Sequence, residues 1–349
     1  MKENFKKYTK LGLRILFLGL GIWLAILVFR HLELDKLAEV FHHLGWKIVI
    51  IWSIPLLWLL AQTLAWHLTV EETGAHISFA QLLIIKITGD AINPLTPLGF
   101  IGGDPVRFSM LKKKMPGTIS AVSVVLDRTV QSLAIVVMLI FTLILAPFRL
   151  DLPTAWKTFF PIMTAIMAGI LWVSIHHQRK GVFVRLSHMA QKFGVSLKKI
   201  DSLREELQHI DQRLLHFYRH SPGRFLSVLI CHLVGRLGLV FEIYVIAFLL
   251  GTPIHLDGAL FMAMLAVLIN IFFIFIPAGM GILEGGYGAL GILLKIGPTA
   301  GVAIQLIRRL RALFWILVGV VFVLITSPGT LKVIFQKTKR GFSLNAPNS

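Results

Sequence analysis

Long apolar stretches alternate with short polar and basic connections along most of the chain. Seven of these stretches are uninterrupted, and each is close to or above the roughly 20 residues that a helix needs to cross a bilayer core. Two further apolar segments, 79–106 and 277–297, are broken by glycine and proline. The pattern predicts an all-α polytopic membrane protein with a single integral membrane domain, residues 1–349. The uninterrupted spans are expected at about 11–29, 46–69, 117–147, 156–175, 225–250, 258–276 and 299–326.

The two broken segments carry an expectation of their own. Backbone groups freed by glycine or proline at membrane depth must face protein or a watery cavity, because lipid offers them no hydrogen bonds. Paired interrupted segments in the two halves of a transporter indicate its binding site. We expect segment 79–106 to be re-entrant, entering and leaving on one side, and segment 277–297 to cross the membrane.

Lysine and arginine predict the orientation. The start of the chain, "MKENFKKYTKLGLR", is basic, which favours a cytoplasmic N-terminus. The loop 176–224 carries ten Lys and Arg against four Asp and Glu, and is also expected in the cytoplasm. The C-terminal tail is basic as well, with Lys332, Lys337, Lys339 and Arg340. A cytoplasmic tail requires about eight crossings in addition to the re-entrant hairpin.

The basic loop contains an amphipathic pattern. Apolar residues recur at spacings of three and four, which predicts a cytoplasmic amphipathic helix with a basic polar face. Such a helix either lies on an anionic leaflet or packs on the protein's own cytoplasmic side. The apolar positions are Leu197, Ile200, Leu203, Leu207, Ile210 and Leu214.

Composition narrows the classes of function. The chain has 349 residues, 56% hydrophobic and 15% charged, where soluble domains carry roughly 25% charged residues. The net charge of +18 would suggest nucleic acid in a soluble protein, but these basic residues gather at span ends, where they fit lipid headgroups instead. Cys231 is the single cysteine, so no disulfide framework and no cysteine-based metal site is expected. No cofactor motif is found.

The segment "GGDPVR" resembles the start of a helix. Asp104 is expected to cap the free N–H groups, and Pro105 loses no needed hydrogen bond at a first helical position. Gly102 and Gly103 allow a sharp turn and a close approach to a ligand. A helix N-terminus suits a phosphate, and Arg107 would add a charged donor. The alternative is a structural re-entrant turn.

Several charges lie deep inside the expected spans. Asp127 and Arg128 are about ten residues into theirs, and adjacent helical residues point about 100° apart, so each should need its own partner. Arg236 and Glu242 should each meet a group on another helix. In the late half, Glu284 lies in a glycine-rich break, and Arg308, Arg309 and Arg311 lie within the last span. Arg128 and Arg309 would approach the midplane from opposite sides, as in inverted-repeat transporters.

A family resemblance rests on four ordered motifs. "AINPLTPLGFIGGDPVRFSML", "VSVVLDRTVQSL", "IPAGMGILEGGYG" and "LIRRLRALF" together resemble the lysylphosphatidylglycerol synthase transmembrane region, a flippase-like family of inner-membrane proteins, and its hopanoid-biosynthesis-associated branch. The resemblance covers about residues 11 to 326. It implies translocation of a lipid, whereas the synthase domain of bifunctional members is not expected here. It points to Asn93, Gly102, Gly103, Asp104, Arg107, Asp127, Arg128 and Glu284, and less specifically to Arg308 and Arg309.

The leading hypothesis is a lipid translocase in a bacterial inner membrane, moving a phosphate-bearing headgroup through a charged midplane cavity. Arg107 and Arg128 would hold phosphate, while Asp127 and Glu284 would balance charge. We expect a transporter rather than an enzyme, since no P-loop, zinc, dinucleotide or nucleophile motif is present. Two alternatives remain open. One is a transferase acting on a polyprenyl, hopanoid or phospholipid substrate, and the other is a non-catalytic partner of a lipid-modifying enzyme. Membrane lipids are the expected ligands, and nucleic acid is not expected.

Overall fold

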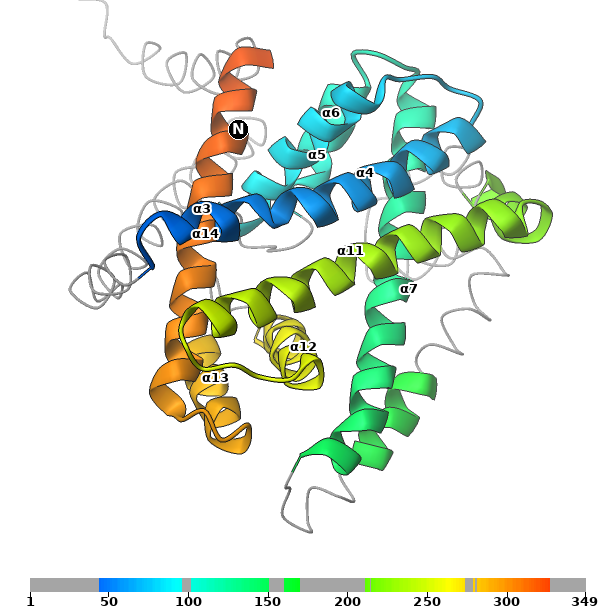
Figure 1. Cartoon of the computed structure of the whole chain (residues 1–349). Helices are drawn as coiled ribbons and strands as arrows, with labels where there is room; N and C mark the ends of the chain where they lie inside the picture. Colours follow the sequence, from blue (N-terminus) through cyan, green and yellow to red (C-terminus); the bar gives the residue numbers. More distant parts are fainter. Residues whose placement is uncertain are drawn as a thin grey trace, which may run out of the picture.

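A computed structural model of the chain gives its architecture (Figure 1). It describes residues 44–95, 102–150, 160–169, 211–213, 215–273, 279 and 281–326. Every regular element within these ranges is a helix, which confirms the prediction of an all-α fold. The expected span 11–29 and most of the expected amphipathic helix lie outside the described residues.

Three described helices are long and apolar enough to cross a membrane. The first, Gly45–Glu72, consists of η1 (Gly45–Lys47), α3 (Ile48–Ser53) and α4 (Pro55–Glu72). Pro55 occupies the first turn of α4, where its missing N–H costs no hydrogen bond. The other two long helices are α7 (Gly117–Arg149) and α11 (Pro222–Leu249).

The bounds of the remaining helices can be compared with the other expected spans. Residues Phe160–Gly169 are helical, within the expected span 156–175. Helix α12 is Leu256–Phe272, α13 is Ile282–Leu293 and α14 is Pro298–Thr326. At 1.5 Å per residue the 12 residues of α13 extend about 18 Å, short of a hydrocarbon core of about 30 Å. The crossing of segment 277–297 and the total of eight crossings therefore stay predictions.

The first broken segment folds into a helical hairpin. Helix α5 (Phe79–Ile92) begins at Ser78, whose side chain accepts a hydrogen bond from the Gln81 N–H, and ends in the short η2 (Asn93–Leu95). Helix α6 (Asp104–Leu111) then packs back against α5 (Figure 1). The expected break is thus present as two short helices, and its re-entrance into a membrane stays a prediction.

The two halves of the described chain repeat one order of elements. A long helix that ends in α4 (Gly45–Glu72), two shorter helices (α5 and α6) and a second long helix (α7) form the first set. The second set consists of the long α11, the shorter α12 and α13, and the long α14. The long helices α4 and α11 pack antiparallel, because Gly235 of α11 lies against Gln62 and the later Gly238 against the earlier Trp58. In Figure 1, α7 and α14 also run in opposite directions, and α6 and α13 lie towards opposite ends of the molecule. The halves are therefore arranged as an inverted repeat.

Apolar side chains remain exposed on the outer faces of the long helices. On α11 the exposed positions follow each other every three or four residues, which makes one continuous stripe. A soluble protein would bury such a stripe, whereas a membrane protein presents it to lipid. The stripe consists of Leu226, Ile230, Val234, Leu237 and Phe241, each 44–55% exposed.

Candidate functional site

The close packing of α6 against α5 depends on two glycines, Gly103 in the turn and Gly89 within α5. The Gly103 N–H donates a hydrogen bond to the Asn93 side-chain oxygen at 2.7 Å. A Cβ atom at Gly103 would lie 1.9 Å from the Gly89 carbonyl oxygen, and one at Gly89 would lie 2.5 Å from Arg107 Cγ. Larger residues at these positions would push α6 away from α5 and displace the Arg107 side chain. Gly102 lies in the same turn.

Asp104 does not cap α6, so that expectation was wrong. The N-cap residue is Gly103, no side-chain cap hydrogen bond forms, and Asp104 is the first helical residue. Its carboxylate instead accepts hydrogen bonds from Arg107 Nη1 at 3.1 Å and from Arg128 Nε at 2.7 and 2.9 Å. Each guanidinium carries a full positive charge, so it adds a Coulomb attraction to this carboxylate that an uncharged backbone N–H does not provide.

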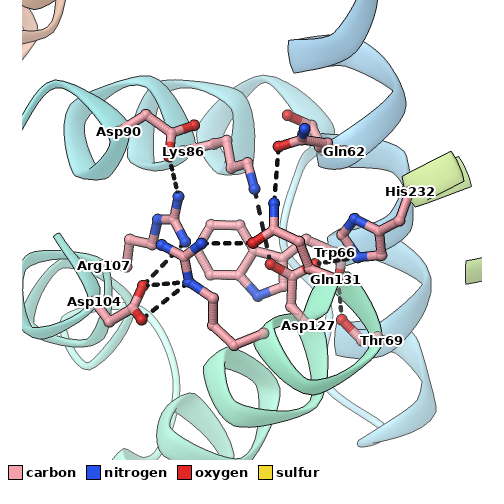
Figure 2. A network of polar contacts seen from close by, with 12 residues as sticks. Gln62, Trp66, Thr69, Lys86, Asp90, Asp104, Arg107, Asp127, Gln131 and His232 are labelled. Atoms are coloured by element: carbon pink, nitrogen blue, oxygen red, sulfur yellow. Dashed lines mark hydrogen bonds and ion pairs between the residues drawn. The ribbon is translucent and has the colours of Figure 1, made fainter. Parts of the chain in front are cut away.

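The Arg107 side chain is buried inside this hairpin (Figure 2). Its Nη2 donates to Asp90 Oδ1 at 2.5 Å, and its guanidinium carbon lies 5.7 Å from the centre of the Trp66 ring. The buried Nε has no hydrogen-bond partner among the described residues. Arg107 is therefore held firmly, with one donor still available.

Arg128 on α7 joins the hairpin to the long helices. Besides Asp104, it contacts Gln131, whose Oε1 accepts from Arg128 Nη1 at 2.5 Å. Gln131 in turn donates to Gln62 Oε1 on α4 at 3.2 Å. The second terminal nitrogen of Arg128, Nη2, is buried and has no partner within the described part of the chain. A second guanidinium donor is thus available beside the one on Arg107.

Asp127 faces a different set of partners from Arg128, as the sequence predicts. Lys86 Nζ lies 3.8 Å from Asp127 Oδ2, and His232 Nε2 lies 3.1 Å from Asp127 Oδ1. These three side chains come from α5, α7 and α11, and each is at most 2% exposed (Figure 2). The neighbouring residues Asp127 and Arg128 therefore place a buried ion pair next to the arginine that faces Asp104.

These groups form what we call the elbow cluster: Lys86, Asp90, Asp104, Arg107, Asp127, Arg128 and Arg236. Arg236, on α11, is counted with them because Arg128 repels it and Asp90 attracts it, while its own Nε has no hydrogen-bond partner among the described residues. With its acids and bases ionised and His232 neutral, the cluster has four positive and three negative charges. One positive charge is in excess, which favours a singly charged anion.

A second group of charges, the late cluster, consists of Glu242, Glu284, Arg308, Arg309 and Arg311. Glu242 on α11 is fully buried and accepts hydrogen bonds from Arg311 Nε at 2.6 Å and Nη2 at 3.2 Å. Arg308 lies 3.5 Å from the same carboxylate and also donates to the Tyr287 hydroxyl. The prediction that Glu242 meets a group on another helix is confirmed. This cluster also has one positive charge in excess.

The two clusters occupy equivalent places in the repeat. Arg128 lies eleven residues after Gly117, the first residue of α7, and Arg309 lies eleven residues after Pro298, the first residue of α14. Arg128 pairs with Asp104 in the first turn of α6, while Arg309 Nε pairs with Glu284 in the first turn of α13 at 2.5 Å.

Two asparagines near the C-terminal ends of α5 and α12 also correspond: Asn93 is the C-cap of α5, and Asn270 lies in the last turn of α12. Asn93 Oδ1 would lie 3.0 Å from a Cβ atom at Gly103, and Asn270 Oδ1 would lie 3.6 Å from one at Gly279. Each half therefore has the same arrangement: an asparagine beside a glycine turn, then an acid that pairs with an arginine on the next long helix. Arg128 and Arg309 are anchored in separate clusters, and their approach to each other at the midplane stays a prediction.

The ten residues proposed from the sequence all lie in or beside these two clusters. Lys86 and His232 are not among the candidate site residues selected from the sequence. Both lie inside apolar runs, and an ionisable residue in such a position is itself an indication of a functional site. Gln62 and Gln131 gave no such signal. Asp104, Arg107, Asp127 and Arg128 belong to the elbow cluster, with Asn93, Gly102 and Gly103 beside it, and Glu284, Arg308 and Arg309 belong to the late cluster. In the ranges that the structure describes, no three His, Cys, Asp or Glu residues are placed to hold a metal ion.

Comparison with known proteins gives two matches. The family model described as the lysylphosphatidylglycerol synthase TM region matches residues 12–320. A UPF0104 membrane protein of Methanothermobacter thermautotrophicus is 23% identical over 271 residues, which cover 73% of this chain and 77% of the relative. No solved structure matches the chain.

Proposed function

Because the chain belongs to the lysylphosphatidylglycerol synthase transmembrane-region family, we propose that it is a lipid translocase that moves a phosphate-bearing headgroup across the membrane. The description of the family supports a membrane protein of lipid metabolism or transport, and the relative is named as a membrane protein. The phosphate-bearing substrate and its translocation are our own proposal. We further propose a bacterial inner membrane with both termini in the cytoplasm.

The elbow cluster carries the proposal. It has one excess positive charge, and two of its buried arginine nitrogens, Arg107 Nε and Arg128 Nη2, have no hydrogen-bond partner within the described residues. A phosphodiester supplies one negative charge and oxygen acceptors that match both needs. A buried donor without a partner costs free energy, so an anion that binds both donors is stabilised there.

The inverted repeat supports movement rather than binding alone. The elbow and late clusters each have one excess positive charge. The late cluster lies in the second half, and the elbow cluster lies in the first half except for Arg236 of α11, which supplies its excess charge. A headgroup released from one cluster would find an equivalent set of groups in the other. The acyl chains would stay in lipid while the headgroup crosses, which removes the large cost of taking a charge through hydrocarbon. No nucleotide-binding motif is present in the sequence, so we propose facilitated or ion-coupled movement.

Reconstitution in liposomes tests this function. The wild type is placed in phosphatidylcholine liposomes with a trace of fluorescent phosphatidylglycerol, and dithionite added outside then reports how much labelled lipid reaches the outer leaflet. We expect the wild type to expose the inner pool. Arg128→Ala should slow exposure at least about ten-fold, because one free donor and the Asp104 pair are lost.

Arg149→Ala is the matched control. Arg149 is on the same helix but is largely exposed, and its pair with Asp257 lies at the surface. This variant should translocate lipid like the wild type. Equal rates for wild type, Arg128→Ala and protein-free liposomes, with phosphatidylglycerol, an aminoacylated lipid and a polyprenyl phosphate all tried, would contradict the proposal.

A further inference from the structure

Three buried ionisable side chains lie next to Arg107 and Arg128, the two arginines of the proposed headgroup site. Lys86, Asp127 and His232 come from three different helices and are almost completely buried. Asp127 lies between the other two, 3.8 Å from the lysine nitrogen and 3.1 Å from the histidine nitrogen. We call these residues the buried triad (Figure 2).

The triad is poorly satisfied for a structural ion pair. Lys86 Nζ, Asp127 Oδ1 and both ring nitrogens of His232 lack a hydrogen bond of good geometry among the described residues. Buried ion pairs stabilise a fold only when hydrogen bonds satisfy their remaining donors and acceptors. A buried cluster without these hydrogen bonds can change its protonation state more easily. Chains of ionisable groups inside membranes commonly carry protons.

Of the three side chains, His232 is the one whose unperturbed pKa is closest to neutral, and its ring nitrogens can take up a proton without breaking any other bond. With His232 neutral, the charges of Lys86 and Asp127 cancel. The charged groups that act on His232 are Asp127, Lys86 and Arg236, and those around Lys86 also include Arg107, Asp90 and Arg128. From α4, the neutral Trp66 and Thr69 lie nearby (Figure 2).

The triad and the headgroup site share two helices. On α7, Asp127 belongs to the triad and the next residue, Arg128, binds Asp104. On α5, Lys86 belongs to the triad and Asp90, one turn later, binds Arg107. A change of charge in the triad therefore acts on the headgroup site both through space and through the position of α5 and α7.

We propose that the buried triad is a proton-binding site, and that His232 takes up one proton from water when an anionic headgroup binds at Arg107 and Arg128. The proton adds to a free ring nitrogen of His232, giving an imidazolium beside the Asp127 carboxylate, and no other bond changes. The added positive charge strengthens anion binding, and by thermodynamic reciprocity the anion strengthens proton binding equally. The coupling rests on the proposed function, whereas the proton site does not.

Calorimetry on the full chain in detergent micelles tests the coupling, with short-chain phosphatidylglycerol as the probe. Titrations in buffers of different ionisation enthalpy count the protons taken up. We expect proton uptake on binding, and an affinity about five-fold higher at about pH 6 than at about pH 8. His232→Gln should still bind the lipid but lose both effects. His67→Gln, at the end of α4, is the control and should behave like the wild type.

A second variant separates this role from a structural one. Lys86→Met removes the cation that competes with His232 for Asp127, so His232 should hold its proton to higher pH. The pH at which affinity changes should therefore shift upward rather than disappear. Loss of pH dependence in His232→Gln without this upward shift in Lys86→Met would overturn the triad as the proton site.

Spectroscopy keeps the proton site testable if no lipid binds. In full-length protein labelled with 15N-histidine in nanodiscs, the His232 signal is identified by its absence in His232→Gln. Titration of this signal between about pH 5 and pH 8 supports the site, and a signal that stays in one state overturns it. A signal that titrates but ignores bound phosphatidylglycerol overturns the coupling alone. Absence of lipid binding at every pH counts against the proposed function instead.

Discussion

At the scale of single residues, burial decides what each charge does. Glu242 is fully buried and receives two arginines, so its two oxygens are satisfied by α14. The triad around Asp127 is equally buried but lacks such bonds. A buried ion pair stabilises a fold when it is hydrogen-bonded as Glu242 is. A buried group that changes its protonation state does not need such bonds, and the triad around Asp127 lacks them. We therefore expect that removing the charge of Glu242 lowers the stability of the protein.

We predict that Glu242→Gln lowers the free energy of unfolding by about 3 kcal/mol, because it leaves the charges of Arg308 and Arg311 buried with a neutral partner. Thermal unfolding in detergent, followed by the fluorescence of the buried tryptophans, measures the effect. Glu71→Gln is the control, since Glu71 forms only a partly exposed pair with His67 and should change stability little. Equal stability of Glu242→Gln and the wild type would contradict the assigned role.

The residues of the site differ in how far the sequence predicts them. Separate partners for Asp127 and Arg128 follow from helix geometry alone, and the structure confirms them. The identity of those partners does not follow, because Arg128 pairs across 24 positions and Glu242 with an arginine across 69. A local pattern shows that a buried charge needs a partner but not which distant segment supplies it.

At the scale of elements, α14 is fixed by two close contacts. A Cβ atom at Gly301 would lie 2.0 Å from the Tyr287 carbonyl oxygen of α13, and one at Gly319 would lie 2.2 Å from Ala91 Cβ of α5. Small residues let helices approach closely within membranes. Helix α14 therefore holds α13 on one stretch and α5, the helix of Lys86 and Asp90, on another.

We predict that Gly319→Ala weakens the contact between α14 and α5 and costs about 2 kcal/mol, because the added methyl overlaps Ala91. Ala91→Gly removes the overlapping methyl, so the double variant should recover part of the loss. Thermal unfolding of the two single variants and the double variant gives the coupling between the positions. Additive losses would show that the two helices do not meet there.

The elements themselves were largely predictable, and the breaks between them less so. The long apolar runs predict α7 and α11 within a few residues, and the glycines and prolines predict the break between α5 and α6. The prediction that Asp104 caps α6 was wrong, because pairing with Arg107 and Arg128 outweighs the local preference of aspartate for the N-cap position. Tertiary charge pairing is not contained in a capping motif.

At the scale of the whole molecule, the inverted repeat is carried by arrangement and hardly by sequence. The aligned positions share an acid, an arginine and a glycine turn, but one half has Asp127-Arg128 where the other has Arg308-Arg309. Helix packing requires only apolar faces and small residues at the contacts, so the two halves are free to differ elsewhere. The spacing of the motifs therefore suggests the symmetry, but the arrangement of the two halves has to be taken from the structure.

We predict that the N-terminal ends of α7 and α14 lie on opposite sides of the membrane. Single cysteines are introduced as Lys114→Cys and Thr299→Cys in a chain whose only cysteine is removed by Cys231→Ser; both positions are exposed. A membrane-impermeant maleimide added to intact cells and to inside-out vesicles should label Thr299→Cys from outside and Lys114→Cys from the cytoplasmic side. Labelling of both from the same side would contradict the inverted repeat.

If the proton that we propose on His232 crosses the membrane together with the headgroup, the transport cycle has an electrical consequence. A singly charged phosphodiester headgroup that moves together with one proton carries no net charge through the membrane. The transmembrane voltage does about 2.3 kcal/mol of work per elementary charge for each 100 mV, and here it would do none over a complete cycle. A difference in pH between the two sides would remain as the force that drives the lipid toward one leaflet. A cell whose voltage has collapsed would then still sort this lipid for as long as its proton gradient lasts.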